Sequence, residues 1–297
     1  MNTTSSKTVA FVTSAWERDW EVVLWPERYE MIVKSHCRSF PIRLIVLNNF
    51  ASQQTQLRAM EASNVLIQLG LATDVIHAPS YLDSQVLSFF EIPNGLFWER
   101  NPYYSTNHIA ALHWMQGKAD YLFHMAGDIW LDRACDWIPR ALGVLDGQDR
   151  IRGLNLCRNI YTDLYSKICH EEMEAVWLSN PRQKAADTGV LVGEGFSLSD
   201  IAYVIRVSPA EGWRFDVTDE DLNRWYPRWP IYARPCFEMY YRIAMERYHF
   251  SHGTLKPIGG GPLTKHKNFP ASQSLKIKLQ KWLGFYSSGG KYATRDT

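Results

Sequence analysis

The sequence predicts an α/β protein whose mostly parallel central sheet is flanked by helices. Short runs rich in β-branched and aromatic residues alternate with segments of helical periodicity over roughly the first 130 residues. Such β-α-β alternation is typical of a parallel sheet covered by helices. The 297 residues are enough for one large domain, so we expect a single α/β unit rather than several small ones.

The predicted strands are short, apolar, and followed by small polar or turn-forming residues. They occupy residues 8–15, 41–49 and 72–79, and a fourth begins at Tyr121. The fourth run breaks at Ala126, Gly127 and Asp128 and resumes as the apolar run Ile129 to Leu131. A carboxylate at this point is either part of a tight turn or part of a binding site.

Helical periodicity marks residues 21–40, 54–70 and 105–118. Pro26 lies near the start of the first helix, and Gly70 is a suitable C-cap for the second. Ser105 or Thr106 is the expected N-cap of the third. The segment between the third strand and this helix is expected to be a loop.

Composition narrows the class of protein. The formal net charge of +1 gives no general attraction to nucleic acid, so we expect no nucleic-acid partner. Five cysteines without CxxC spacing indicate reduced thiols, as in a cytoplasmic protein. The first residues have no apolar core typical of a secretory signal, and no run reaches the roughly 18 apolar residues of a membrane span.

Polar side chains follow the predicted strands at one edge of the sheet. Thr13 and Ser14 end the first strand, Asn48 ends the second, and Asp128 follows the fourth. Open parallel sheets bind ligands at the carboxyl ends of their strands. The sequence therefore predicts a ligand site at this edge.

With these residues, the chain resembles the GT-A class of nucleotide-sugar-dependent glycosyltransferases over residues 8–270. The tripeptide Ala126-Gly127-Asp128 is similar to their DxD motif, with Ala126 in place of the first acid. The resemblance implies that Asp128 binds a divalent metal, Mn²⁺ or Mg²⁺, which holds the donor diphosphate. It also implies a donor site formed by Thr13, Ser14, Asn107, Asp128 and Lys256.

The same resemblance divides the chain. Residues 1–270 would form the glycosyltransferase domain, with the nucleotide-sugar half at about 1–135 and the acceptor half at 136–270. In the acceptor half, residues 185–200 resemble the strand that lines the acceptor, so Asp187 and Thr188 would face the sugar. An ordinary strand preceded by a turn is the alternative. Trp225 belongs to a group of tryptophans whose flat faces could stack on sugar rings.

The segment TDEDL at residues 218–222 is similar to the xED motif of inverting GT-A enzymes. That likeness assigns Asp221 or Glu220 as the base that takes the proton from the acceptor hydroxyl. The structural alternative is a helix start, with Thr218 as the N-cap and Asp221 at the third helical position. Both roles are open on the sequence.

The segment HGTLKP at residues 252–257 is similar to part of a motif in retaining GT-A enzymes. The likeness implies that His252 binds the metal and Lys256 the diphosphate. Alternation along a strand places these two residues on one face. The basic triplet at residues 265–267 is expected to be a solvated loop.

These observations predict a metal-assisted, inverting glycosyltransferase that transfers a sugar from a nucleotide-diphospho-sugar to a glycan or lipid-linked hydroxyl, as in bacterial polysaccharide synthesis. The alternatives are a retaining enzyme and a non-catalytic relative that binds carbohydrate or nucleotide-sugar. Residues 271–297 form a basic amphipathic tail. It suits peripheral contact with an anionic membrane, at the inner face of the cell membrane, or docking on the domain.

Overall fold

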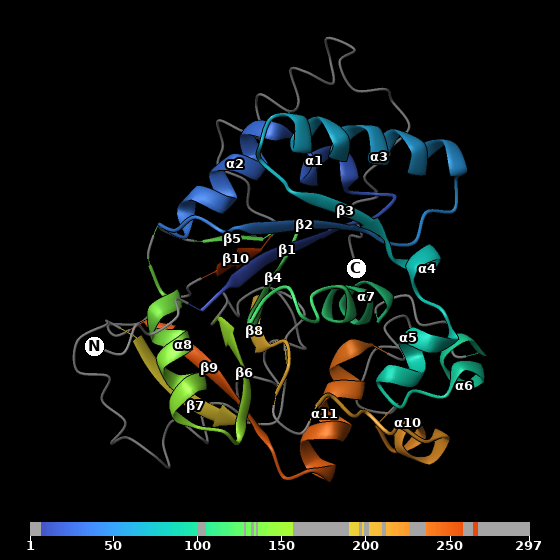
Figure 1. Ribbon diagram of the computed structural model, residues 1–297, viewed down its shortest axis with the longest axis vertical. Helices are drawn as coiled ribbons and strands as arrows, with labels where there is room; N and C mark the ends of the chain where they lie inside the picture. The colour runs from blue at the N-terminus through green and yellow to red at the C-terminus, as the bar shows by residue number, and fades with distance from the viewer. Residues whose placement is uncertain are drawn as a thin grey trace, which may run out of the picture.

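The computed structural model describes residues 7–99, 105–127, 129–131, 134, 136–156, 190–195, 198, 202–209, 212–225, 236–257 and 264–266. An eight-stranded sheet forms the centre of this part of the chain, in the order β3-β2-β1-β4-β8-β6-β9-β7 (Figure 1). The strands are β1 (Val9–Ala15), β2 (Ile42–Leu47), β3 (Asp74–His77), β4 (Tyr121–Ala126), β6 (Ile151–Leu156), β7 (Val190–Gly195), β8 (Ala202–Arg206) and β9 (Ser251–Pro257).

Most strands of the sheet share one direction. β1 pairs in parallel with β2 and β4, β2 with β3, and β6 with β9. β8 is antiparallel to both β4 and β6, and β7 is antiparallel to β9. The predicted α/β class with a mostly parallel central sheet is therefore confirmed, and one sheet runs through both of the predicted halves.

Alternation along β1 divides the core into two layers. Val9 and Phe11 pack into one apolar cluster, whereas Ala10 and Val12 pack into the other. The first face is covered by α1 (Trp20–Val23), α2 (Pro26–Ser35), α3 (Gln53–Gln68) and α8 (Ile138–Gly147). The second is covered by α4 (Ala78–Tyr81), α5 (Ser84–Phe89), α6 (Asn94–Glu99), α7 (Thr106–Trp114), α10 (Asp219–Trp225) and α11 (Phe237–Arg247).

Two local expectations need correction. The predicted helix at 21–40 is divided into α1 and α2, because Pro26 takes the first position of a new helix after the extended residue Trp25. The predicted loop before α7 contains α4, α5 and α6. Gly70 does end α3, with a left-handed φ of 67°.

The apolar run after Gly127 does not continue β4. It forms β5 (Ile129–Leu131), which pairs antiparallel with β10 (Thr264–His266) in a separate two-stranded sheet. In this register His266 is opposite Ile129 and Lys265 is opposite Trp130. The segment expected to be a solvated basic loop is therefore held as a strand beside the turn that follows β4.

The predicted boundary at residue 270 and the tail at 271–297 lie outside the described residues. Within the described part, none of the helices has the length and apolar character needed to cross a bilayer.

Candidate functional site

The carboxyl ends of β1, β2 and β4 lie side by side. Ser14 is paired with Val46 of β2 on one side and with Ala126 of β4 on the other. Directly after β2, the Asn48 amide donates a hydrogen bond of 2.8 Å to the carbonyl of Ala15. Residues at the end of each strand are thereby brought to one edge, which we call the carboxyl edge.

Five polar side chains at this edge are joined by hydrogen bonds, and we call them the rim cluster: Ser14, Asn48, Thr106, Asn107 and His124. The Asn107 side-chain amide donates to the Ser14 hydroxyl at 2.8 Å, and that of Asn48 reaches the Asn107 side-chain oxygen at 3.4 Å. The Thr106 hydroxyl donates to the Asn48 side chain, and Ser14 Oγ lies 3.2 Å from His124 Nε2. The cluster thus joins three strands to the start of α7.

The rim cluster combines uncharged hydrogen-bonding groups with a helix N-terminus. Thr106 and Asn107 are the first residues of α7, whose initial N–H groups have no partners within the helix. Such amides favour anionic groups, including phosphates. The start of α7 therefore gives this edge N–H groups suited to an anionic group, next to side chains that are mostly buried.

Thr13 does not belong to the cluster, although it adjoins Ser14 in sequence. Its hydroxyl donates to the Met125 carbonyl at 2.9 Å, so its side chain links β1 to β4. Neighbouring residues of a strand face opposite sides of the sheet. The role of Thr13 in donor binding therefore stays a prediction, and its described hydrogen bond is to β4 and not to the cluster.

Aromatic and imidazole rings pack behind the rim cluster. The rings of His108 and His124 are 4.5 Å apart, and His108 Nδ1 lies 2.7 Å from the Tyr203 hydroxyl. Burial, together with the neighbouring His124, lowers the pKa of His108 well below its usual range. A neutral His108 therefore packs behind the site and adds no positive charge to it.

Gly127 lets the turn after β4 approach the end of β1 closely. A Cβ at this position would lie 2.3 Å from a methyl group of Val23 and 2.7 Å from the Ser14 carbonyl oxygen. Asp128 itself lies outside the described residues, but Gly127 before it and Ile129 after it are placed. Gly127, the residue before Asp128, thus lies directly beside the rim cluster.

We expect Gly127→Ala to destabilise the fold by about 2 kcal/mol, in the range of overpacking substitutions, because the added carbon meets a backbone oxygen. Urea unfolding measures this change. Gly143→Ala is the matched control, since Gly143 lies in α8 with open space around it and alanine favours helices. Equal stability of the two variants would show that the close approach at Gly127 is absent.

The predicted pairing of His252 with Asp128 at a metal is not supported by the position of His252. His252 lies in the same cross-strand row as Leu122, through Ile205 and Gly153. Leu122 is four residues before the end of β4, a distance of about 13 Å along the strand. β9 begins at the opposite edge of the sheet, which we call the amino edge, and His252 is near that beginning.

The surroundings of His252 also differ from those expected of a metal-binding histidine. It is 1% exposed, and its Nδ1 lies 2.8 Å from the hydroxyl of Tyr241. A Cβ on Gly153 would lie 3.0 Å from the imidazole ring, so this glycine makes room for it. Burial lowers the pKa of His252 to about 3. His252 is thus a neutral core residue.

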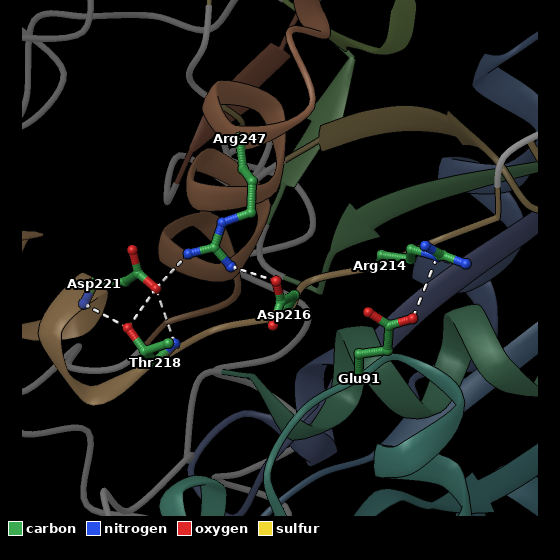
Figure 2. A network of polar contacts seen from close by, with 6 residues as sticks. All are labelled: Glu91, Arg214, Asp216, Thr218, Asp221 and Arg247. Atoms are coloured by element: carbon green, nitrogen blue, oxygen red, sulfur yellow. Dashed lines mark hydrogen bonds and ion pairs between the residues drawn. The ribbon is translucent and has the colours of Figure 1, made fainter.

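The predicted base Asp221 is held in a network at the amino edge (Figure 2). Its carboxylate accepts hydrogen bonds from the Thr218 amide at 2.9 Å and hydroxyl at 2.6 Å, and the Asp221 amide donates to the Thr218 hydroxyl. This is a reciprocal helix cap. The same carboxylate binds Arg247 at 2.7 Å, and Arg247 ends α11 just before β9 begins.

Asp221 is consequently unsuited to act on a sugar bound at the carboxyl edge. Burial raises the pKa of Asp221, but the hydrogen bonds from Thr218 and Arg247 outweigh it, so the pKa lies below its usual range. A carboxylate with a lowered pKa is a weaker base. Glu220 is the preceding residue of the same helical turn and is exposed. The structural alternative, a helix start, accounts for both acids.

We expect Asp221→Asn to reduce stability by about 1 kcal/mol, the usual effect of losing a helix cap, without a specific loss of catalytic rate. Thr218→Ala should produce a similar loss because it removes the other half of the cap. Glu220→Gln is the control. A hundredfold fall in rate at unchanged stability for Asp221→Asn would instead restore the predicted base.

The remaining predicted residues are only partly described. Asp187 and Thr188 lie outside the described residues. For Lys256 in β9 and Trp225 in α10, the backbone is described and the side chain is not. The backbone register places Lys256 opposite Leu191, close to the carboxyl end of β9. The backbone of Lys256 therefore lies close to the carboxyl edge, where the sequence predicted the donor site.

The sequence analysis missed His266 as a candidate. Its backbone pairs with Ile129, the residue after Asp128. Within the described residues no group of three or more His, Cys, Asp and Glu side chains could hold a metal ion. The clue was the basic triplet at 265–267, whose pairing with β5 could not be foreseen without the fold.

Comparison with known proteins gives limited information. No family model matches the chain, and no curated protein matches it. Among solved structures, the chain is similar to a mycobacterial protein at 11% identity, with a TM-score of 0.45, covering 96% of this chain and 77% of that one. It is also similar to glucosyl-3-phosphoglycerate synthase from Mycobacterium tuberculosis in complex with phosphoglyceric acid, at 12% identity and a TM-score of 0.41, covering 96% and 82%.

A third similar structure is the galactosyltransferase LgtC in complex with donor and acceptor sugar analogues. The identity is 9% and the TM-score 0.38, with 94% of this chain and 96% of that one covered. At these identities and TM-scores the likeness by itself fixes neither the family nor the activity of this chain.

Proposed function

We propose that this protein is a glycosyltransferase that binds a nucleotide-diphospho-sugar at the carboxyl edge of its sheet. The observation that supports this most is the rim cluster, which joins β1, β2 and β4 to the N-terminus of α7 beside Gly127. Open parallel sheets bind ligands at this edge. The resemblance of the sequence around Asp128 to GT-A enzymes indicates that the ligand is a nucleotide-diphospho-sugar.

The chemistry of the edge suits this donor in two ways. Asn48, Asn107 and Ser14 supply donors and acceptors without charge, as recognition of a base or ribose requires. The amides at the start of α7 favour a diphosphate. Further neutralisation of the diphosphate falls to Lys256 and to a cation at Asp128.

The proposal includes a divalent metal, Mn²⁺ or Mg²⁺, with Asp128 as one ligand. Carboxylate oxygens and imidazole nitrogens are ordinary ligands of such ions. His266 replaces His252 as the imidazole candidate, because its strand is paired with the residue after Asp128. Bound there, the metal would neutralise charge on the diphosphate.

The proposal also covers the acceptor and the stereochemistry of the transfer. The acceptor is a glycan or lipid-linked hydroxyl, with Asp187 and Thr188 on its side of the site. Trp225 is left out of this proposal, because it lies in α10 with Asp221, at the amino edge. Peripheral membrane contact through residues 271–297 remains a prediction, since the tail lies outside the described residues. Inversion loses the support that Asp221 gave it, so the anomeric configuration of the product, read by NMR, must decide between inversion and retention.

Binding of nucleotide-sugars tests the proposal. A calorimetric panel of UDP-, GDP-, dTDP- and CMP-linked sugars, with and without Mn²⁺, should identify one donor that binds. Asn107→Ala should weaken that binding about tenfold, as expected for losing hydrogen bonds to a buried ligand. Asn223→Ala is the matched control, since Asn223 is an exposed asparagine of α10.

Two results would contradict the proposal. Absence of binding by every nucleotide-sugar would exclude the donor site, and equal binding by the Asn107 and Asn223 variants would remove it from the rim cluster. A non-catalytic relative that binds nucleotide-sugar is the second candidate, because Ala126 replaces the first acid of the motif. Donor binding without donor hydrolysis or transfer to any hydroxyl would identify that candidate.

A further inference from the structure

A pocket of about 600 Å³ lies at the amino edge of the sheet, away from the rim cluster. Its walls come from the start of β6, the segment before α10, the end of α11 and the turn that leads into β9. We call it the amino-edge pocket and describe it by five of its lining residues: Arg152, Trp213, Arg214, Tyr248 and Phe250. Its volume is typical of small-molecule sites.

Aromatic rings form much of the wall. The indole N–H of Trp213 donates to the Arg206 carbonyl at 2.9 Å, so the polar atom of Trp213 is already used. The Trp213 ring is fixed from behind by Phe215, stacked at 6.0 Å, and by Tyr241 at 5.7 Å. Tyr248 and Phe250 line the pocket as well. A planar or apolar group would find flat, rigid surfaces here.

Two guanidinium groups give the pocket positive charge. The Arg152 guanidinium carbon lies 3.6 Å from the centre of the Phe250 ring, and Arg152 is only 3% exposed. Arg214 is 60% exposed and contacts Glu91 at 3.2 Å. Among the described lining residues there is no carboxylate. A charge held against apolar walls attracts an anion more strongly than a charge in water does.

Ion pairs join the elements around the pocket (Figure 2). Arg247 binds Asp216 at 3.0 Å and Asp221 at 2.7 Å, and so ties the end of α11 to the segment that precedes α10. Asp216 and His249 have left-handed φ values of 41° and 56°, which cost energy in residues other than glycine. Such conformations persist where the surrounding structure enforces them, and they concentrate at ligand sites.

We propose that the amino-edge pocket binds a small organic anion that carries a planar ring. The ring lies against Trp213 and Phe250, and the anionic group, a carboxylate or a phosphate, accepts hydrogen bonds from Arg214. Guanidinium groups suit both anions because they donate in pairs. The inference does not rest on the proposed glycosyl transfer, since the pocket shares no residue with the rim cluster.

Calorimetric titration with four probes tests the ligand class. Phenyl phosphate and phenylacetate combine a ring with an anion, benzyl alcohol has the ring alone, and inorganic phosphate has the anion alone. We expect one or both ring anions to bind at least tenfold more tightly than either control. The tighter of the two identifies the anionic group as phosphate or carboxylate. Failure of both to bind at millimolar concentration would overturn the proposal, as would equal binding of benzyl alcohol or inorganic phosphate.

Variants then locate the bound probe. Arg214→Gln should weaken binding at least tenfold, whereas Arg224→Gln, an exposed arginine of α10 that does not line the pocket, should leave it unchanged. Asn107→Ala should also leave it unchanged, because Asn107 belongs to the rim cluster. Loss of binding in the Asn107 variant, or unchanged binding in the Arg214 variant, would place the probe elsewhere and refute the assignment.

Discussion

Replacing Asp128 with Asn should lower the rate of sugar transfer at least a hundredfold while the free energy of unfolding stays within about 0.5 kcal/mol. The substitution keeps the size of the side chain and removes the negative charge that would hold a divalent cation. The cation would otherwise neutralise charge on the leaving diphosphate. Steady-state transfer with the donor identified by calorimetry measures the rate, and urea unfolding measures the stability.

Asp136→Asn is the matched control, because Asp136 is an exposed acid of the same region that follows β5. His266→Ala should show a fall in rate in the same direction as Asp128→Asn, and added Mn²⁺ should stabilise the unaltered protein more than either variant. Full transfer by the unaltered protein in EDTA would refute the metal. Unchanged transfer by Asp128→Asn would remove Asp128 from the site.

Acidification from pH 6.5 to pH 5 should destabilise the protein by about 3 kcal/mol through the two buried histidines His36 and His252. Burial lowers the pKa of His36 and of His252 to about 3, from 6.5 in the unfolded chain. The slope for each histidine rises to about 1.36 kcal/mol per pH unit as the unfolded imidazole becomes fully protonated, which gives about 1.6 kcal/mol over this range. The total is a large part of the 5–15 kcal/mol typical of folded domains.

The sign follows from where protons bind. Between pH 3 and pH 6.5 the unfolded chain takes up protons at these two imidazoles and the folded chain does not. Stability is therefore fully present above pH 6.5 and falls as the pH drops through this interval. His36 is held neutral by its surroundings, since its Nδ1 accepts a 3.0 Å hydrogen bond from Trp137 and its ring lies 4.7 Å from that of Phe123.

Urea unfolding at pH 7, 6 and 5 measures the effect, and His36→Phe tests its source. The phenyl ring fits an aromatic surrounding and does not titrate, so the pH slope should fall by the share of one buried histidine, about 1.4 kcal/mol per pH unit below pH 6. The Trp137 N–H loses its acceptor in this variant, which lowers stability equally at every pH. A slope identical to that of the unaltered protein would show that His36 is not the titrating group.

Local sequence signals correctly predicted the first four strands and the helices α3 and α7. The apolar runs became β1, β2, β3 and β4, and Ser52 and Gly70 mark the two ends of α3. The short helices α4, α5 and α6 were missed because four to six residues are too few to show helical periodicity. Pro26 was noticed but not recognised as the first residue of a second helix.

The candidate site was predicted less well because strand direction and cross-strand pairing are tertiary properties. Asn48 was predicted at the correct edge, but its contact with Asn107 spans 59 residues and depends on how α7 packs. His252 and Lys256 both belong to β9, as the sequence predicted for a shared strand. Because β9 runs parallel to β6, however, only the Lys256 end of that strand reaches the carboxyl edge.

The pairing of β5 with β10 has a consequence for how the protein is made. On the ribosome, β5 emerges well before β10, since α8 and β6 to β9 are synthesised between them. The strand β5 that follows Gly127 therefore has no partner until His266 has left the exit tunnel. A nascent chain can order β1 to β4 early, but β9 ends at Pro257 and β10 begins at Thr264, so the second half of the sheet and the proposed ligand site are completed together, near the end of synthesis.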